Sequence, residues 1–168
     1  MTKLNKKEKE LVHLLKENAR LSSEDLGQMV GLPSSKVQSL IQSWQKDGII
    51  LKHTTLFNEE KLESTHDTIR ALIEVSIRPE KKTGFDAIAR RICKHPNVID
   101  HYLISGNYDF LIIVEGKSLQ EISSFVSNTL ASIENVRSTG THFILKKYKE
   151  NGIALGTEEM ENRILVSA

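Results

Sequence analysis

A run of five apolar residues at positions 110–114, FLIIV, limits what this chain can fold into. The run is too short to cross a membrane, and a turn signal, Gly106-Asn107, precedes it closely. Such a run predicts a strand that is buried on both faces. Helices of the same chain can cover one face of the strand, so something else must cover the other.

The first 48 residues carry three short helical patterns in close succession. The first begins at Asn5 and the second at Ser22, and each has an acidic residue three positions on, Glu8 and Asp25, as in a capping box. The third pattern covers residues 33–48, and a turn of about four residues, VGLP, precedes it. This spacing matches a helix-turn-helix, and the β-branched run after it, IILKHTTLF, predicts a strand or wing.

The third helical pattern separates into two faces. Its apolar residues, Val37, Leu40, Ile41 and Trp44, share one face and are expected to pack inward. The remaining surface is polar and gives the candidate DNA-binding residues: Ser34, Ser35, Lys36, Gln38, Ser39, Gln42 and Lys46. Ser and Gln can hydrogen-bond base edges and Lys can neutralise phosphate, although any three-helix bundle also has a polar outer face.

Charge and cysteine content narrow the class of protein further. Residues 1–56 carry nine Lys/Arg against six acidic residues, a small positive excess that permits phosphate contact. The N-terminus has lysines without an apolar stretch after them, so no secretion signal is expected. Cys93 is the single cysteine, which excludes an intrachain disulfide and favours a reducing, cytoplasmic location.

The remainder of the chain alternates between strand and helix patterns. Strands are predicted at 70–77, 98–105, 109–116 and 141–148, and helices at 84–96 and 118–133. The order βαββαβ predicts an α+β, ferredoxin-like sandwich with one antiparallel sheet and both helices on one face. We therefore expect a winged helix-turn-helix domain at 1–56, a linker at 57–68, a ferredoxin-like domain at 69–152 and a tail at 153–168.

This topology suggests what covers the second face of the buried strand. If both helices lie on one face of the sheet, side chains on the other face have no partner within the chain. Either Leu111 and Ile113, or else the residues that alternate with them along the strand, would then be exposed in a monomer. A bare apolar sheet face is typical of an interface, so we expect self-association through this sheet.

Four stretches in family order resemble the Lrp/AsnC (feast/famine) family of transcriptional regulators. The most specific is SGNYDFL, similar to the family's Gly-Asp-Tyr-Asp turn; the others are ENARLSSEDLGQMVGLPSSKVQ, KDGII and VRSTGTHFIL. The resemblance implies a winged helix-turn-helix that binds double-stranded DNA and a RAM-type effector domain that forms homodimers by sheet packing. It also implies tetramers or octamers and a small effector such as an amino acid.

The same resemblance points to effector-binding positions near that turn and the last strand: Gly106, Asn107, Tyr108, Asp109, Thr139 and Thr141. A carboxylate can pair with the ammonium group of an amino acid, while turn amides and Thr hydroxyls can hold its carboxylate. The alternative is that these turn residues only shape the turn.

Three residues depart from the family pattern. Asn107 replaces the usual Asp and removes a negative charge from the loop. Leu40 stands where many members carry Arg in the recognition helix. Pro33 stands where members have a capping Ser, so the helix cap is expected to shift to Ser34.

Enzymatic alternatives have less support in the sequence. The six histidines show no ligand spacing with Cys or carboxylates, so no metal or other cofactor is expected, and Cys93 is predicted to lie in the core. A non-enzymatic regulator is the leading hypothesis. The alternatives are a sirohaem-decarboxylase-like protein of the same architecture and an effector-independent architectural DNA-binding protein.

Overall fold

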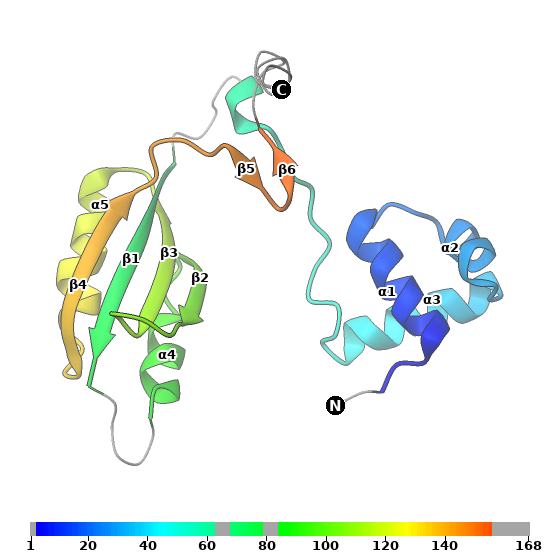
Figure 1. Cartoon of the computed structure of the whole chain (residues 1–168), viewed down its shortest axis with the longest axis horizontal. Helices are drawn as coiled ribbons and strands as arrows, with labels where there is room; N and C mark the ends of the chain where they lie inside the picture. Colours follow the sequence, from blue (N-terminus) through cyan, green and yellow to red (C-terminus); the bar gives the residue numbers. More distant parts are fainter. Residues whose placement is uncertain (1–2, 63–67, 79–83, 156–168) are drawn as a thin grey trace, which may run out of the picture. The chain divides into compact units, whose positions relative to one another are not determined.

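The computed structural model describes residues 3–62, 68–78 and 84–155. The chain forms two compact units, Met1–Phe57 and Asn58–Ala168 (Figure 1). Within the described residues, no helix has the length and apolar character needed to cross a membrane.

The first unit is a bundle of helices α1 (Lys6–Glu17), α2 (Ser23–Val30) and α3 (Ser34–Lys46). Both predicted capping boxes are present. Asn5 and Ser22 each accept a hydrogen bond from a backbone N–H three residues on, and the acidic side chain at that position accepts one from the cap residue. These bonds satisfy N–H groups that a helix start leaves without partners. The core contains Leu11, Leu26, Val30, Val37 and Trp44.

The turn between α2 and α3 depends on two glycines. Gly31 has φ 64° and ends α2 in the left-handed conformation. Gly27 is buried in α2, and a Cβ atom there would lie 2.6 Å from the Leu32 carbonyl oxygen. The expected cap at Ser34 was wrong: Pro33 is the N-cap residue of α3 and makes no side-chain cap hydrogen bond, since Ser34 is already inside the helix.

The strand predicted within residues 49–57 is absent from this described segment. The N–H groups of Ile49 and Ile50 instead donate to the Trp44 carbonyl, at 2.8 and 3.0 Å, and close the end of α3. The β-branched composition was misleading, because a strand requires a partner strand and no other described segment of this unit supplies one.

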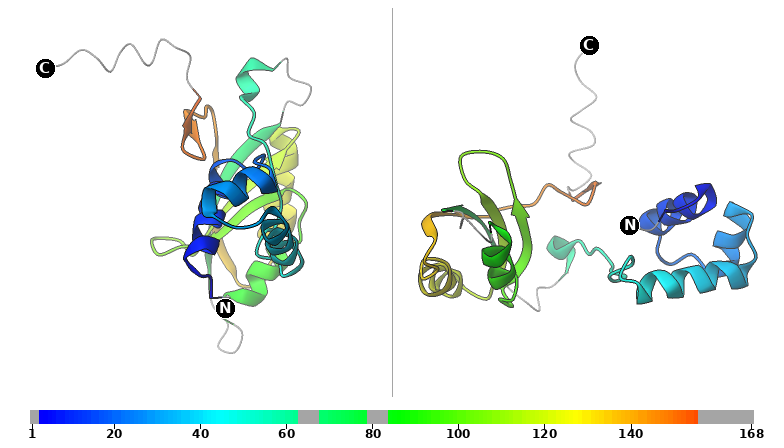
Figure 2. Two further views of the ribbon diagram at one scale, coloured as in Figure 1. Left: turned by 90° about the vertical axis from the view of Figure 1, so that its right-hand side faces the viewer. Right: turned by 90° about the horizontal axis from the view of Figure 1, so that it is seen from below.

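The second unit contains the predicted βαββαβ order. Its elements are β1 (Ile69–Ile77), α4 (Asp86–Ile92), β2 (Val98–Leu103), β3 (Phe110–Gly116), α5 (Leu119–Phe125) continuing as the π-helical η2 (Val126–Leu130), and β4 (Val136–Phe143). The antiparallel sheet has the strand order β2-β3-β1-β4. Figures 1 and 2 show α4 and α5 on the same face of this sheet.

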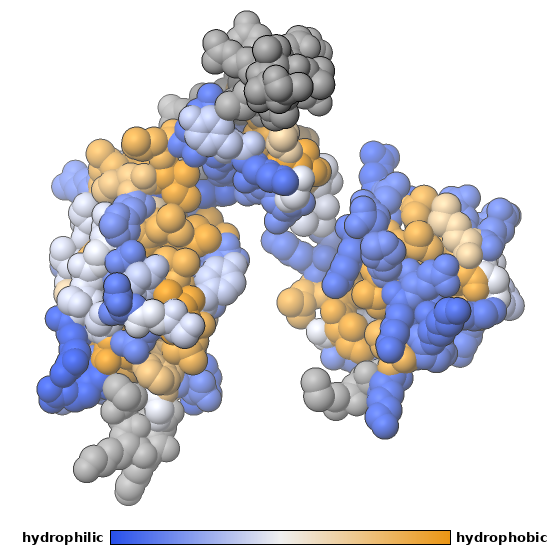
Figure 3. All heavy atoms as spheres, in the orientation of Figure 1, coloured by the Kyte–Doolittle hydropathy of each residue, from blue (hydrophilic) through white to orange (hydrophobic). Residues whose placement is uncertain are grey.

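Burial alternates along the two central strands. In β3, Phe110, Ile112 and Val114 are at most 1% exposed and pack toward the helices, whereas Leu111 and Ile113 point to the other face and are only partly buried. Side chains of α4 and α5, such as Ile92 and Ile122, complete the core on the helix side. We call the opposite side the open face; it is toward the viewer in Figure 3, where apolar side chains form a stripe along it.

Several element boundaries differ from the predicted ones. β4 begins at Val136 and ends at Phe143, so both ends lie five residues before those of the predicted strand 141–148. Pairing with β1 sets this register. α4 is shorter than the predicted 84–96. Cys93, which was predicted to lie in the core, is the C-cap residue of α4 and is exposed, since the helix ends before its apolar face can bury it.

Two short elements near the C-terminal end were not predicted. β5 (Lys149–Glu150) and β6 (Ile153–Ala154) form a hairpin whose turn residues, Asn151 and Gly152, have φ values of 47° and 85°. Asn-Gly with positive φ at both positions is the signal of a type I′ hairpin turn. The remaining residues of the predicted tail, 156–168, lie outside the described residues.

Candidate functional sites

Helix α3 has one buried apolar face and one exposed polar face. Val37 and Trp44 are buried against α1 and α2, and Leu40 and Ile41 are half-buried at the edge of the same core. The candidate DNA-binding residues are all exposed: Ser34, Ser35, Lys36, Gln38, Ser39, Gln42 and Lys46. The helix therefore presents a fixed polar face, and its orientation is held by the buried apolar face.

Contacts at both ends hold this helix in place. At the turn before α3, Lys7 Nζ donates a hydrogen bond of 2.6 Å to the Gly31 carbonyl and links α1 to the end of α2. At the other end, Gln45 Nε2 lies 3.2 Å from His53 Nε2 in the segment that follows. Ser39 Oγ donates to the Ser35 carbonyl at 2.9 Å, so its hydroxyl can still accept a hydrogen bond from a ligand.

The loop between β2 and β3 is fixed to the sheet through Asp109. Its carboxylate Oδ2 accepts a hydrogen bond of 2.8 Å from the Ile77 backbone N–H, at the point where the β1–β4 register shifts. The Asp109 N–H donates to the Val75 carbonyl at 3.0 Å, and its carbonyl accepts from Ile104 at 2.9 Å. One carboxylate oxygen thus shapes the loop, which is the structural role considered as the alternative for this residue.

The other candidate effector residues lie on two neighbouring parts of the unit. Gly106 and Asn107 are exposed in the loop and Tyr108 is half-buried. On β4, Thr139 pairs with Val75 of β1, so Thr139 and Asp109 flank the same residue from opposite sides. Two strand spacings separate them, roughly 10 Å. Thr141 is exposed and lies two pairs further along, opposite Ile73.

The open face has an apolar centre with one acidic residue. Leu72 of β1 pairs with Ile113 of β3, and Glu74 pairs with Leu111. Leu111 and Ile113 were named as oligomer-interface residues, and the register places both on the face that α4 and α5 leave uncovered. His142 of β4 pairs with Leu72 on the same face, and its Nε2 lies 3.5 Å from Glu74 Oε1.

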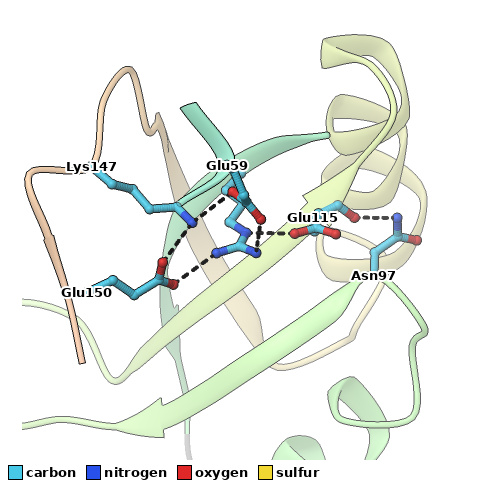
Figure 4. A network of polar contacts seen from close by, with 6 residues as sticks. Glu59, Asn97, Glu115, Lys147 and Glu150 are labelled. Atoms are coloured by element: carbon cyan, nitrogen blue, oxygen red, sulfur yellow. Dashed lines mark hydrogen bonds and ion pairs between the residues drawn. The ribbon is translucent and has the colours of Figure 1, made fainter. Parts of the chain in front are cut away.

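One end of the open face carries an ion-pair network that the sequence did not indicate (Figure 4). Arg70 Nε donates to Glu115 at 2.6 Å, and its terminal nitrogens lie 3.3 Å from Glu150 and 3.8 Å from Glu59. Lys147 bridges Glu59 and Glu150 at 3.3 and 3.2 Å. Lys147 and Glu150 lie three residues apart, but Glu59, Arg70 and Glu115 come from separate segments, so local spacing could not reveal the whole network.

The electrostatics of Arg70 follow from this arrangement. Partial burial by itself lowers the pKa of Arg70, but the hydrogen bond to Glu115 and the nearby carboxylates outweigh it, and the net pKa is raised. The guanidinium therefore remains charged and holds the β5–β6 hairpin and residue Glu59 against the sheet.

A Cys–His contact lies on the helix side of the sheet. Cys93 Sγ is 3.3 Å from His101 Nδ1, and the His101 ring packs edge-on against Phe110 with ring centroids 4.5 Å apart. His101 Nε2 is buried without a hydrogen-bond partner, and burial lowers the pKa of His101. Among the described residues, no group of three or more His, Cys, Asp or Glu side chains is placed to hold a metal ion.

Family models match both units. Residues 4–50 match a winged helix-turn-helix DNA-binding domain, and residues 70–154 match the Lrp/AsnC ligand-binding domain. A helix-turn-helix unit followed by an α+β ligand-binding unit defines a class of DNA-binding transcriptional regulators. The chain belongs to the Lrp/AsnC family within that class.

Relatives along the full chain agree with this assignment. An uncharacterised HTH-type transcriptional regulator of Bacillus subtilis, YugG, is 36% identical over 165 residues, covering 98% of this chain and 99% of the relative. A transcriptional regulator from Neisseria meningitidis, solved as an L-Met complex, is 27% identical with a TM-score of 0.66 and covers 91% of this chain and 97% of that one. The fold is also shared with the Mycobacterium tuberculosis leucine response regulatory protein, at a TM-score of 0.70 and 19% identity over 91% of this chain and all of that one.

Proposed function

We propose that α3 enters the major groove of operator DNA and reads sequence mainly through Gln38 and Gln42, while Lys36 and Lys46 contact phosphates. The observation that carries the proposal is the exposure of these side chains on a helix whose other face is held by the buried Val37 and Trp44. Gln is suited to bidentate contact with adenine, and Lys supplies a sequence-independent charge term.

The two roles give different results in a binding assay. Gln42→Ala should weaken specific binding by roughly 1–3 kcal/mol and leave the salt dependence unchanged. Lys46→Ala should weaken specific and non-specific binding alike and reduce the salt slope by about one. Gln120→Ala, at an exposed position of α5, is the matched control. Equal effects of all three variants would overturn the assignment.

We propose that a small amino acid binds near the loop at 105–109 and the outer strand β4. The proposal is supported by a carboxylate and turn amides in the loop, by two Thr hydroxyls about two strand spacings away on β4, and by the L-Met complex of the Neisseria meningitidis protein. Because Asp109 Oδ2 is already bonded to the Ile77 N–H, only its second oxygen is offered to an ammonium group in this proposal.

Calorimetry of the full chain against each of the twenty amino acids tests this site. Thr141→Val should lower the affinity of any amino acid that binds by about tenfold, equivalent to the loss of one hydrogen bond. Thr55→Val, at an exposed position of the first unit, should leave it unchanged. Absence of heat with all twenty would favour an effector-independent architectural protein.

We also propose that a second copy of the chain covers the open face and so forms a homodimer. Support comes from the partly exposed apolar pair Leu72–Ile113 and from Leu111, which α4 and α5 leave uncovered. Dimerisation would link two copies of α3, which raises affinity for DNA through effective concentration.

A further inference from the structure

The centre of the open face carries a carboxylate among apolar neighbours. Glu74 lies near the middle of β1, a central strand of the sheet, and its cross-strand partners are Leu111 on one side and Gly140 on the other. Leu72 precedes it on the same face. The Glu74 side chain is 37% exposed, so it remains hydrated in a single chain.

His142 is the counterpart of this carboxylate. Its Nε2 lies 3.5 Å from Glu74 Oε1, and its side chain is 60% exposed. Gly140 has no side chain beside the pair. A Cβ atom there would contact both groups, at 3.5 Å from Glu74 Oε2 and 3.7 Å from His142 Nε2. The two groups form an ion pair only when the imidazole is protonated.

Face-to-face pairing of two copies would change the surroundings of Glu74. In an isologous interface, a residue near the centre of the patch lies close to the two-fold axis and therefore near its own copy. Two Glu74 carboxylates would approach each other and lose water, and unpaired charges are costly to bury. Each carboxylate then needs a compensating positive charge or a proton.

We infer that the open-face dimer takes up protons as it forms, with the Glu74–His142 pair of each chain as the proton-binding site. The inference rests on the proposed dimer. A protonated His142 neutralises Glu74 beneath the second copy, whereas a neutral His142 leaves the carboxylate charge uncompensated. The dimer binds more protons than two separate chains do, so lowering the pH favours the dimer.

Other charged groups on the open face act outside this pH range or are already paired. Glu115 is paired with Arg70 at the far end of the face. On β2, the register puts Asp100 and Tyr102 opposite Ile113 and Leu111. Carboxylates and phenols in water change charge outside the range from pH 6 to pH 8, whereas imidazoles change charge within it. His142 is the histidine that pairing with β1 places on this face.

Sedimentation equilibrium of the full chain at pH 6, 7 and 8, in buffers with EDTA, tests the inference. For the unmodified chain, the dimer dissociation constant should fall by at least about tenfold from pH 8 to pH 6. Glu74→Gln keeps the shape of the side chain and removes its charge, so this variant should dimerise tightly at pH 8 with little further change at pH 6.

Two histidine variants complete the test. His142→Gln removes the titrating group and retains the carboxylate, so it should dimerise weakly at all three pH values. His13→Gln alters an exposed histidine of the first unit and should behave like the unmodified chain.

The outcomes separate this inference from the proposed dimer. If the unmodified chain and Glu74→Gln are both monomeric at every pH and remain folded by circular dichroism, the proposed dimer is wrong. A dimer whose affinity does not change with pH, or a Glu74→Gln dimer no tighter than the unmodified one at pH 8, overturns the inference alone.

Discussion

Gly27 and Gly106 differ in what a side chain would meet. At Gly27, a Cβ atom would lie 2.6 Å from the Leu32 carbonyl, a backbone atom that cannot move aside. At Gly106, nothing lies within 4 Å of the added atom, and φ is not in the left-handed region. Gly27→Ala should therefore cost about 1–3 kcal/mol in urea unfolding, whereas Gly106→Ala should change stability by less than about 0.5 kcal/mol.

This pair of variants also bears on the effector proposal. Because Gly106→Ala leaves the fold intact, any loss of amino-acid binding in that variant reports on the loop itself. A large loss of stability in Gly106→Ala would contradict the geometry described for this turn.

His101 makes stability depend on pH in a direction set by its burial. Burial lowers the pKa of His101 in the folded chain, so the unfolded chain takes up the proton first as the pH falls below about 6.5. Its contribution to stability is complete above that pH and is lost as the pH falls toward the lowered folded pKa. The free energy of unfolding, measured in urea, should be lower at pH 5 than at pH 7.

His101→Leu should reduce the acid-dependent loss and remain within about 1 kcal/mol of the unmodified chain at pH 7, since it also removes a buried Nε2 that has no partner. His13→Leu, at an exposed position of α1, is the control. An equal pH dependence in both variants would show that the effect does not come from His101.

At the scale of elements, Arg70 joins one end of the central strand β1 to the β5–β6 hairpin. Arg70→Met would remove the cation paired with Glu115 and leave Glu150 with Lys147 alone, and both carboxylates are less than a third exposed. We expect a cost of about 1–3 kcal/mol and faster amide exchange at Leu155, whose N–H donates to the Tyr148 carbonyl across the hairpin. Lys149→Met, at an exposed hairpin position, should have little effect.

The same elements show where local signals were sufficient. Both capping boxes of the first unit were predicted because cap and acidic residue lie three positions apart in the sequence. The strand within 49–57 and the start of β4 were predicted wrongly because strands depend on their partners, which local composition does not specify. The hairpin at 149–154 was not predicted, although Asn151-Gly152 is a sequence signal for a hairpin turn.

At the scale of the whole molecule, the open face should decide the oligomeric state. Leu111→Asp puts a charge at its apolar centre, opposite Glu74, and should increase the dimer dissociation constant at least about a hundredfold at pH 6. The variant should still unfold cooperatively, since Leu111 lies outside the core on the helix side. Sedimentation equilibrium measures the first effect and urea unfolding the second. An unchanged dimer would place the interface elsewhere.

The sequence by itself determined the order of elements, the polar face of α3 and the family, because these depend on residue periodicity and short motifs within single segments. The tertiary structure decided which alternates of β3 face the helices, that Asp109 bonds the Ile77 N–H, and that Arg70 and Glu74 have the partners described above. Those contacts join residues distant in sequence. Strand register and chain packing create them, and neither is encoded in any single segment.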